Sequence, residues 1–172
     1  MERDELARAI TERCRLTGSF LLRSGATSDV YFDKYRFESD PLLLKAVAEQ
    51  LAPRVGADIE ALAGLEMGGI PIATMLAQCT GKPAFFVRKQ AKEYGTCQLA
   101  EGGEIAGKEL LVVEDVVTSG GQVVLSTQDL RERGAQVSRA VCVIDREAGG
   151  REKLAEIGVE LIALFTRSEL ES

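Results

Sequence analysis

The sequence predicts a single α/β domain with a mostly parallel β-sheet that is covered by helices on both faces. Three observations predict it. Short, continuously apolar segments recur at regular intervals, helix-like segments that end at glycine separate most of them, and the chain of 172 residues is long enough for one such domain. Strands that are apolar throughout, alternating with helices, are typical of a parallel sheet buried on both sides.

The N-terminal segment predicts a helix over residues 4–17. Leu6, Ile10 and Cys14 recur one helical turn apart, and Gly18 follows as a stop. The stretches FLLRSG and SDVYFDKYRF that come next are short and strand-like, with turn residues between them.

The central sheet is predicted to have five strands, separated mostly by helices. Asp40 and Pro41 form a helix start, with a capping residue followed by proline at the first helical position. The strands are expected at residues 59–63, 84–87, 110–113, 138–144 and 159–165, and the later helices at residues 70–78, 122–133 and 151–157. Residues 88–108 show no periodicity, and loops of that length in a compact domain are usually functional lids or disordered.

Composition excludes several classes of function. A net charge of −6 argues against a nucleic-acid-binding protein, which needs clustered Lys and Arg. The chain has no histidine, which excludes Ser-His-Asp and Cys-His chemistry and histidine metal sites. Its apolar runs are too short to span a bilayer, so no membrane association is expected. No signal peptide is visible and the four cysteines are scattered, which indicates a cytoplasmic protein with reduced thiols.

The stretch VVEDVVTSGG, residues 112–121, is the first candidate site. Glu114 and Asp115 follow an apolar strand, and ligands of open α/β sheets bind beyond the carboxyl ends of the strands. Thr118 to Gly121 form the turn into the next helix, whose free amides and positive dipole end suit a phosphate. The stretch therefore predicts a phosphate cradle with two carboxylates nearby for hydroxyls or a cation.

Other interpretations of this stretch are weaker. The acids could simply cap the turn, with TSGG as an ordinary helix N-cap. An ATPase of the Walker type would need G-x-x-x-x-G-K-[ST], and a dinucleotide-binding unit would need G-x-G-x-x-G after a strand; neither pattern occurs.

The segment LLVVEDVVTSGGQ closely resembles the phosphoribosyl pyrophosphate (PRPP) motif of type I phosphoribosyltransferases. The resemblance implies that the two acids hold the ribose hydroxyls and that the following loop holds the 5′-phosphate. It implies Mg²⁺ as cofactor, held mainly by PRPP with Glu114 and Asp115 assisting, and no dedicated metal site. The PRPP-binding residues of this motif would be Glu114, Asp115, Val116, Val117, Thr118, Ser119, Gly120, Gly121 and Gln122.

A second segment, VRKQAKEYGT, resembles the mobile catalytic loop of orotate phosphoribosyltransferases. The resemblance implies that Arg88, Lys89 and Lys92 bind the diphosphate of PRPP, that Lys92 helps protonate it, and that the loop closes over the site of a neighbouring subunit. With Asp115 these three residues form the expected catalytic set. A loop rich in Lys and Arg can also be merely solvated.

Two further segments resemble parts of the same family that recognise the base. FLLRSGATSDVYFDKYRF resembles its N-terminal hood, in which Tyr31 and Phe32 would face the pyrimidine and Arg23 would supply a cation; Phe32 could equally be core. VIDREAGG resembles the segment whose arginine, here Arg146, pairs with the orotate carboxylate. Thr118 completes the expected orotate-binding set, while Asp145 and Glu147 are as readily structural.

GLEMGGIPIA, residues 64–73, stands where the family has its pyrophosphate loop and adds Met67 and Gly68 to the expected PRPP contacts. Many relatives have lysine where this chain has Gly68, lysine in place of Arg23, and histidine in place of Tyr94.

The resemblance as a whole implies an orotate phosphoribosyltransferase that forms a homodimer. Its fold would be that of a type I phosphoribosyltransferase: a single domain over residues 1–172, with a hood mainly in 1–38, a core at about 40–172 and a mobile loop at 88–108. A purine phosphoribosyltransferase and a non-catalytic PRPP-sensing regulator are the alternatives on the same fold.

Overall fold

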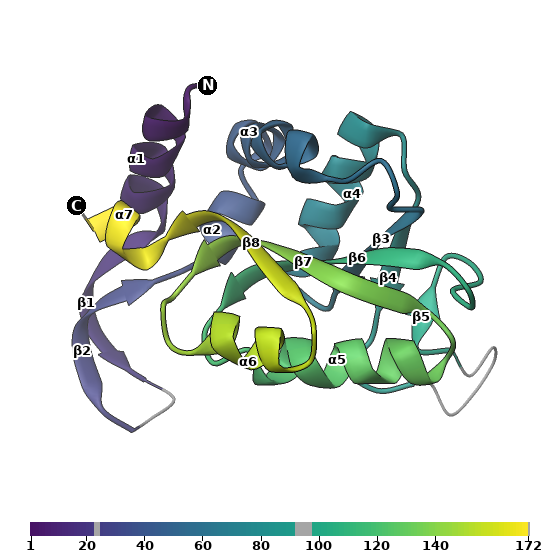
Figure 1. The fold of residues 1–172 in the computed structure, drawn as a ribbon. Coiled ribbons are helices and arrows are strands. Elements are labelled where there is room, and N and C mark those ends of the chain that lie inside the picture. Colours follow the sequence, from purple (N-terminus) through teal and green to yellow (C-terminus); the bar gives the residue numbers. More distant parts are fainter. Residues whose placement is uncertain (23–24, 92–97, 172) are drawn as a thin grey trace.

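The computed structural model describes residues 1–22, 25–91 and 98–171, and its centre is a six-stranded sheet with helices on both faces (Figure 1). The strands are β1 (Arg15–Leu21), β2 (Thr27–Phe32), β3 (Ala61–Leu65), β4 (Ala84–Val87), β5 (Ala100–Glu101), β6 (Glu109–Val117), β7 (Gln136–Asp145) and β8 (Glu160–Thr166). The helices are α1 (Arg3–Cys14), α2 (Tyr35–Glu38), α3 (Pro41–Leu51), α4 (Gly69–Thr80), α5 (Gly121–Glu132), α6 (Gly150–Glu156) and α7 (Arg167–Glu171), with a 3-10 turn at Ala52–Arg54.

The central sheet has the strand order β5-β4-β3-β6-β7-β8. The five strands that the sequence predicts are present and mutually parallel. The predicted number of five is wrong, because β5 adds a sixth strand that runs antiparallel to β4. This strand lies within residues 88–108, and its two residues are too few to produce a periodic pattern.

Both faces of the sheet are buried, as the apolar strands predict. Along β6, Leu111 and Val113 belong to one hydrophobic cluster, while Leu110 and Val112 belong to the other. This alternation follows from the two-residue period of a strand. The first cluster lies under α1, α3 and α4, and the second under α5 and α6, on the opposite side of the sheet (Figure 1).

The N-terminal region departs from the prediction of a helix over residues 4–17. The helix ends at Cys14, and Arg15–Leu21 instead forms β1, which pairs antiparallel with β2. The β1–β2 hairpin is a sheet of its own, at one end of the molecule (Figure 1). The last part of the strand-like stretch SDVYFDKYRF is also not a strand, because Tyr35–Glu38 forms the short helix α2.

The start of α3 confirms the Asp40–Pro41 signal. Asp40 Oδ1 accepts hydrogen bonds from the amides of Leu42 and Leu43, at 3.0 and 3.2 Å, and Pro41 is the first helical residue. None of the helices in the described ranges is long and apolar enough to cross a membrane.

Candidate functional site

The candidate residues gather at the carboxyl edge of the sheet. Strands β3, β6 and β7 are parallel neighbours, so the segments that follow them lie at the same edge. These segments contain the glycines after β3, the Thr118–Gly121 turn after β6, and Arg146 after β7. One edge of the sheet therefore carries most of the residues that the sequence singles out.

The acidic pair lies inside β6 rather than just beyond it, because the strand continues to Val117. Asp115 is 0% exposed, and Glu114 is partly exposed. The Lys34 ammonium lies 2.5 Å from Asp115 Oδ2 and 5.3 Å from the centre of the Tyr35 ring. Lys34 comes from the segment between β2 and α2, so it links the N-terminal region to the central strand.

These charges shift one another's titration. Burial alone would raise the pKa of Asp115, but the ion pair with Lys34 outweighs it and holds that pKa below its usual range. Burial and the neighbouring Asp115 charge raise the pKa of Glu114 to about 8. Burial, a side-chain hydrogen bond with Asp115 and the charge of Asp115 raise the pKa of Glu38, a buried residue of α2, to about 9. Asp115 is thus the ionised acid, while Glu38 and Glu114 hold protons at neutral pH.

The Thr118–Gly121 turn leaves its amides available. Gly120 is the N-cap of α5 with φ of 72°, and no side chain caps the helix. Within the described part of the chain, no protein group accepts a hydrogen bond from the amides of Thr118 to Gln122. Thr118 and Ser119 are exposed. The turn can therefore present donors to an anion. TSGG does contain the N-cap residue of α5, Gly120, but no side chain caps the helix.

A second glycine turn packs against the first. The Cα of Gly150, at the start of α6, would lie only 3.0 Å from a Cβ added at Gly120. A Cβ at Gly150 would in turn lie 2.6 Å from the carbonyl oxygen of Thr118. The two turns fit only because both residues lack a side chain, which gives Gly150, the second glycine of VIDREAGG, a structural reason.

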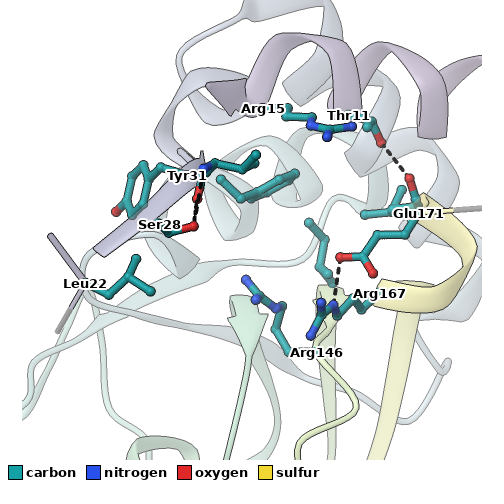
Figure 2. A pocket seen from close by; sticks show the side chains of 12 residues that line it. Thr11, Arg15, Leu22, Ser28, Tyr31, Arg146, Arg167 and Glu171 are labelled. Atoms are coloured by element: carbon teal, nitrogen blue, oxygen red, sulfur yellow. Dashed lines mark hydrogen bonds and ion pairs between the residues drawn. The ribbon is translucent and has the colours of Figure 1, made fainter. Parts of the chain in front are cut away.

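Tyr31, Phe32 and Arg146 line one cavity of about 840 Å³ (Figure 2). It lies between the β1–β2 hairpin, the end of β7 and the C-terminal helix α7. Arg146 points into the space between the hairpin and α7 (Figure 2). Tyr31 is 44% exposed and stacks on Phe20 with ring centres 5.5 Å apart. Phe32 lines the cavity and also packs against the core, so its core role is confirmed and its contact with the pyrimidine stays a prediction.

Arg146 is held in place by its own backbone and its neighbours. Its amide donates to the carbonyl of Val117 at 2.8 Å, which ties it to the end of β6. Asp145 accepts from the Glu147 amide at 2.9 Å and pairs with Arg151 at 3.1 Å. Glu147 accepts from the amide and hydroxyl of Ser168, at 2.9 and 2.6 Å. Asp145 and Glu147 are thus structural, and Arg146 between them remains available to the cavity.

The loop between β3 and α4 covers Asp115. A Cβ at Gly68 would collide with the Asp115 carboxylate, so no side chain fits at this position. Met67 is 63% exposed, and Glu66 Oε1 accepts from the Lys89 amide at 2.5 Å. This contact joins the loop to the start of residues 88–108. The absence of a lysine at Gly68 is therefore a steric requirement of this packing.

The other residues predicted for the site fall into three groups: one held in an ion pair, three that do not line the cavity, and three outside the described residues. Arg88 pairs with Glu101 of β5 at 3.3 Å. Thr118, Glu114 and Asp115 do not line the cavity at Arg146. Arg23, Lys92 and Tyr94 lie outside the described residues.

Sequence reasoning missed Lys34 and Glu38. Both reach Asp115 through the tertiary fold, and no local pattern marks either residue. It also missed Arg15 and Arg167, which line the cavity from β1 and α7; Arg167 is paired with Glu171 at 2.7 Å.

The oxygen-rich acidic pair fits a supporting role toward a hard cation such as Mg²⁺. Among the described residues no group of three or more Asp, Glu, Cys or His side chains could hold a metal ion by itself. Asp115 is moreover engaged by Lys34. These two carboxylates by themselves could give such an ion only part of its coordination shell.

Comparison with known proteins agrees with this arrangement. Residues 37–163 match the phosphoribosyl transferase domain family. The chain is 50% identical to an orotate phosphoribosyltransferase of Nocardioides sp. over 97% of this chain and 93% of that protein. It is also 50% identical to one of Halobacterium salinarum, over 89% and 87%. The Mycobacterium tuberculosis orotate phosphoribosyltransferase in complex with Fe(III) dicitrate has a TM-score of 0.89 at 29% identity, covering 99% of both chains. The chain therefore belongs to the phosphoribosyl transferase domain family, among the orotate phosphoribosyltransferases.

Proposed function

We propose that the protein transfers phosphoribose from PRPP to N1 of orotate, giving orotidine 5′-monophosphate and diphosphate, a step of pyrimidine biosynthesis. The observation that carries the proposal is the joint placement of two anion sites at one sheet edge. The Arg146 amide is bonded to Val117, directly before the open amides of the Thr118–Gly121 turn. Relatives that are half identical over nearly the whole chain bear the same activity in their names, which supports it.

Each part of the site has a role in this reaction. Arg146 pairs with the orotate carboxylate, and Tyr31 and Phe32 face the pyrimidine ring from the hairpin. The amides of Thr118 to Gln122 bind the 5′-phosphate, and the Thr118 hydroxyl contacts the base. Glu114 and Asp115 hold the ribose hydroxyls. The protein mainly positions the two substrates and stabilises charge, which needs neither a histidine nor a covalent nucleophile.

The proposal includes Mg²⁺, held mainly by the diphosphate of PRPP with Glu114 and Asp115 as supplementary ligands. Mg²⁺ is commonly bound by one or two carboxylates together with substrate phosphates. When bound, the ion neutralises the diphosphate and orients it as a leaving group. A solved structure of the Mycobacterium tuberculosis relative holds PRPP, and it covers 99% of both chains at 26% identity with a TM-score of 0.84.

We assign the departing diphosphate to Arg88, Lys89 and Lys92, supplied by residues 88–108 of a partner in a two-fold homodimer. Lys92 protonates or neutralises the leaving group. A protein of net charge −6 needs a local cluster of cations to attract a multiply charged anion. Closure of the segment over the site would exclude water from the reacting centre. The substrates are small molecules, with no role for nucleic acid or membrane, and the expected location is the cytoplasm.

The alternatives are a purine phosphoribosyltransferase and a non-catalytic PRPP sensor. The adenine phosphoribosyltransferase of Leishmania donovani is 17% identical, so its TM-score of 0.73 shows the fold alone. Incubation with PRPP, Mg²⁺ and one base at a time separates the three functions. We expect diphosphate release and a nucleotide product with orotate, and none with adenine, hypoxanthine or uracil. Product from a purine base, or PRPP binding without any turnover, would contradict the proposal.

A further inference from the structure

Lys34 is placed to do more than balance a buried charge. Its ammonium pairs with Asp115 Oδ2 at 2.5 Å, and Asp115 is one of the two acids assigned to the ribose. Among the described residues Lys34 is the only cation within ion-pair distance of either acid. The single positive charge at this point of the site thus comes from the segment between β2 and α2.

The neighbouring loop cannot supply that charge. Gly68 lies against the Asp115 carboxylate so closely that even a Cβ would collide with it. Residues 64–73, GLEMGGIPIA, contain no Lys or Arg. A phosphate group approaching between this loop and the acidic pair would therefore meet carboxylates, backbone and the ammonium of Lys34.

The Lys34 side chain has the freedom to change partners. It is 34% exposed, whereas the Asp115 side chain is 1% exposed, so the ammonium covers the acid from the solvent side. Its long, flexible stem lets the charged end rotate without movement of the backbone. When Lys34 leaves, Asp115 is uncovered at the position where the ribose hydroxyls are expected.

We propose that Lys34 is a PRPP-binding residue that exchanges Asp115 for a diphosphate oxygen of PRPP and thereby frees Asp115 for the ribose. In the empty enzyme the pair keeps a buried acid compensated; in the complex the diphosphate takes the ammonium and the ribose hydroxyls take the carboxylate. This inference rests on the proposed function only in that PRPP is the ligand, and it does not depend on which base is used.

The first test measures PRPP binding by calorimetry, with Mg²⁺ present and no base. Wild type is compared with Lys34→Met, Lys34→Arg and the control Lys45→Met, which removes a surface lysine that pairs with Glu49 within α3. We expect the dissociation constant for PRPP to rise about tenfold or more in Lys34→Met, because a charge-assisted contact is lost. Lys34→Arg should recover most of the affinity, and Lys45→Met should leave it unchanged. Unchanged affinity in Lys34→Met would overturn the inference.

A purely structural role of Lys34 needs a separate test, since its removal leaves Asp115 buried and uncompensated. Asp115→Asn removes that charge, so Lys34→Met should destabilise the wild type but not the Asp115→Asn variant, as followed by thermal unfolding. If Lys34 contacts PRPP, Lys34→Met weakens PRPP binding in both backgrounds. If it acts only through Asp115, the effect on binding disappears in the Asp115→Asn background, and the inference fails.

Steady-state kinetics distinguish this inference from the proposed function. With orotate as the base, Lys34→Met should raise KM for PRPP and leave KM for orotate near the wild-type value. If wild type binds PRPP through Lys34 but does not convert orotate, the proposed function fails while the inference stands. If orotate is converted and KM for PRPP does not change in Lys34→Met, the inference fails while the proposed function stands.

Discussion

Asp115 carries a negative charge in a position that water does not reach, and three side chains respond to it. Lys34 pairs with it directly, and the pKa values of Glu114 and Glu38 are raised by burial and by its charge. A buried charge is tolerated only with a partner, and its neighbours then titrate to the neutral form. The acids of this site are therefore not equivalent, although they look alike in the sequence.

Glu38 gives this asymmetry a measurable consequence. Its pKa is raised from 4.5 to about 9 in the folded chain. Between these values the folded protein holds a proton that the unfolded chain has lost, so the stabilisation is complete below pH 4.5 and is lost as pH rises toward 9. Glu114, with a pKa of about 8, acts in the same direction. The lowered pKa of Asp115 acts in the opposite direction, but only below its usual value of 3.8. The raised pKa of Lys34 acts in the same direction as that of Glu38, but only above its usual value of 10.5.

We therefore expect the free energy of unfolding to fall from pH 6 to pH 9, by up to about 1.4 kcal/mol per pH unit for each group. Glu38→Gln should reduce this slope, because glutamine has no proton to lose. Urea denaturation of ligand-free protein in a metal chelator measures it, with the exposed Glu152→Gln as control. Equal slopes for Glu38→Gln and wild type would show that Glu38 is ionised in the folded chain.

Arg146 supports a second prediction at this scale. Arg146→Ala should lower kcat/KM for orotate by roughly 10²–10³, and Arg146→Lys should recover part of it, because lysine keeps the charge but not the two-pronged geometry. Stability should change little, since the turn is held by Asp145 and Glu147 instead. The control is Arg133→Ala, an exposed arginine after α5. A loss confined to KM for PRPP would contradict the assignment of Arg146 to orotate.

At the scale of elements, the two glycines of the Thr118–Gly121 turn differ in whether they can accept a side chain. Gly120 has a φ of 72°, and a Cβ added to it would lie 3.0 Å from the backbone of Gly150. A Cβ added at Gly121 would meet only Ser119 Oγ, at 3.9 Å. Gly120→Ala should therefore destabilise the fold by about 1–3 kcal/mol and weaken PRPP binding. Gly121→Ala is the matched control and should retain both. Thermal unfolding and PRPP calorimetry check this, and equal effects of the two substitutions would contradict it.

Helices and strands were predictable from the sequence where the residues of the element itself determine its structure. The strand before the acidic pair is apolar without interruption, and Asp40–Pro41 caps α3 as its chemistry requires. The prediction failed where pairing with a distant segment determines the local structure. Residues 15–17 fit the helix pattern of α1, yet they pair with β2 instead, and β5 exists only through its contact with β4.

The candidate site divides in the same way. Arg146, Tyr31 and Phe32 belong to recognisable segments, and the structure brings them to one cavity. Lys34 belongs to one of these segments too, but its contact with Asp115 arises only when the hood packs on β6. Gly68 looked like a lost lysine in the sequence, and its steric reason becomes visible only with Asp115 beside it.

At the scale of the whole molecule, the described residues place a single positive charge on the acidic pair. Lys34 is the single cation on the acidic pair within the described ranges, and Arg88 is paired with Glu101. PRPP carries several negative charges, and we expect Mg²⁺ and further cations to balance them. A partner subunit in a two-fold dimer would supply Arg88, Lys89 and Lys92 reciprocally to each site.

This arrangement predicts complementation between two inactive variants. Lys92→Ala and Asp115→Asn should each be nearly inactive as homodimers. After mixing and subunit exchange, a hybrid dimer holds one site with an intact Asp115 and an intact Lys92 from the other chain, so activity should recover to about a quarter of wild type. The control mixes Lys92→Ala with the double variant Lys92→Ala/Asp115→Asn, which can form no intact site. Light scattering reports the dimer, and a monomer, or hybrids without recovered orotate turnover, would show that each chain completes its own site.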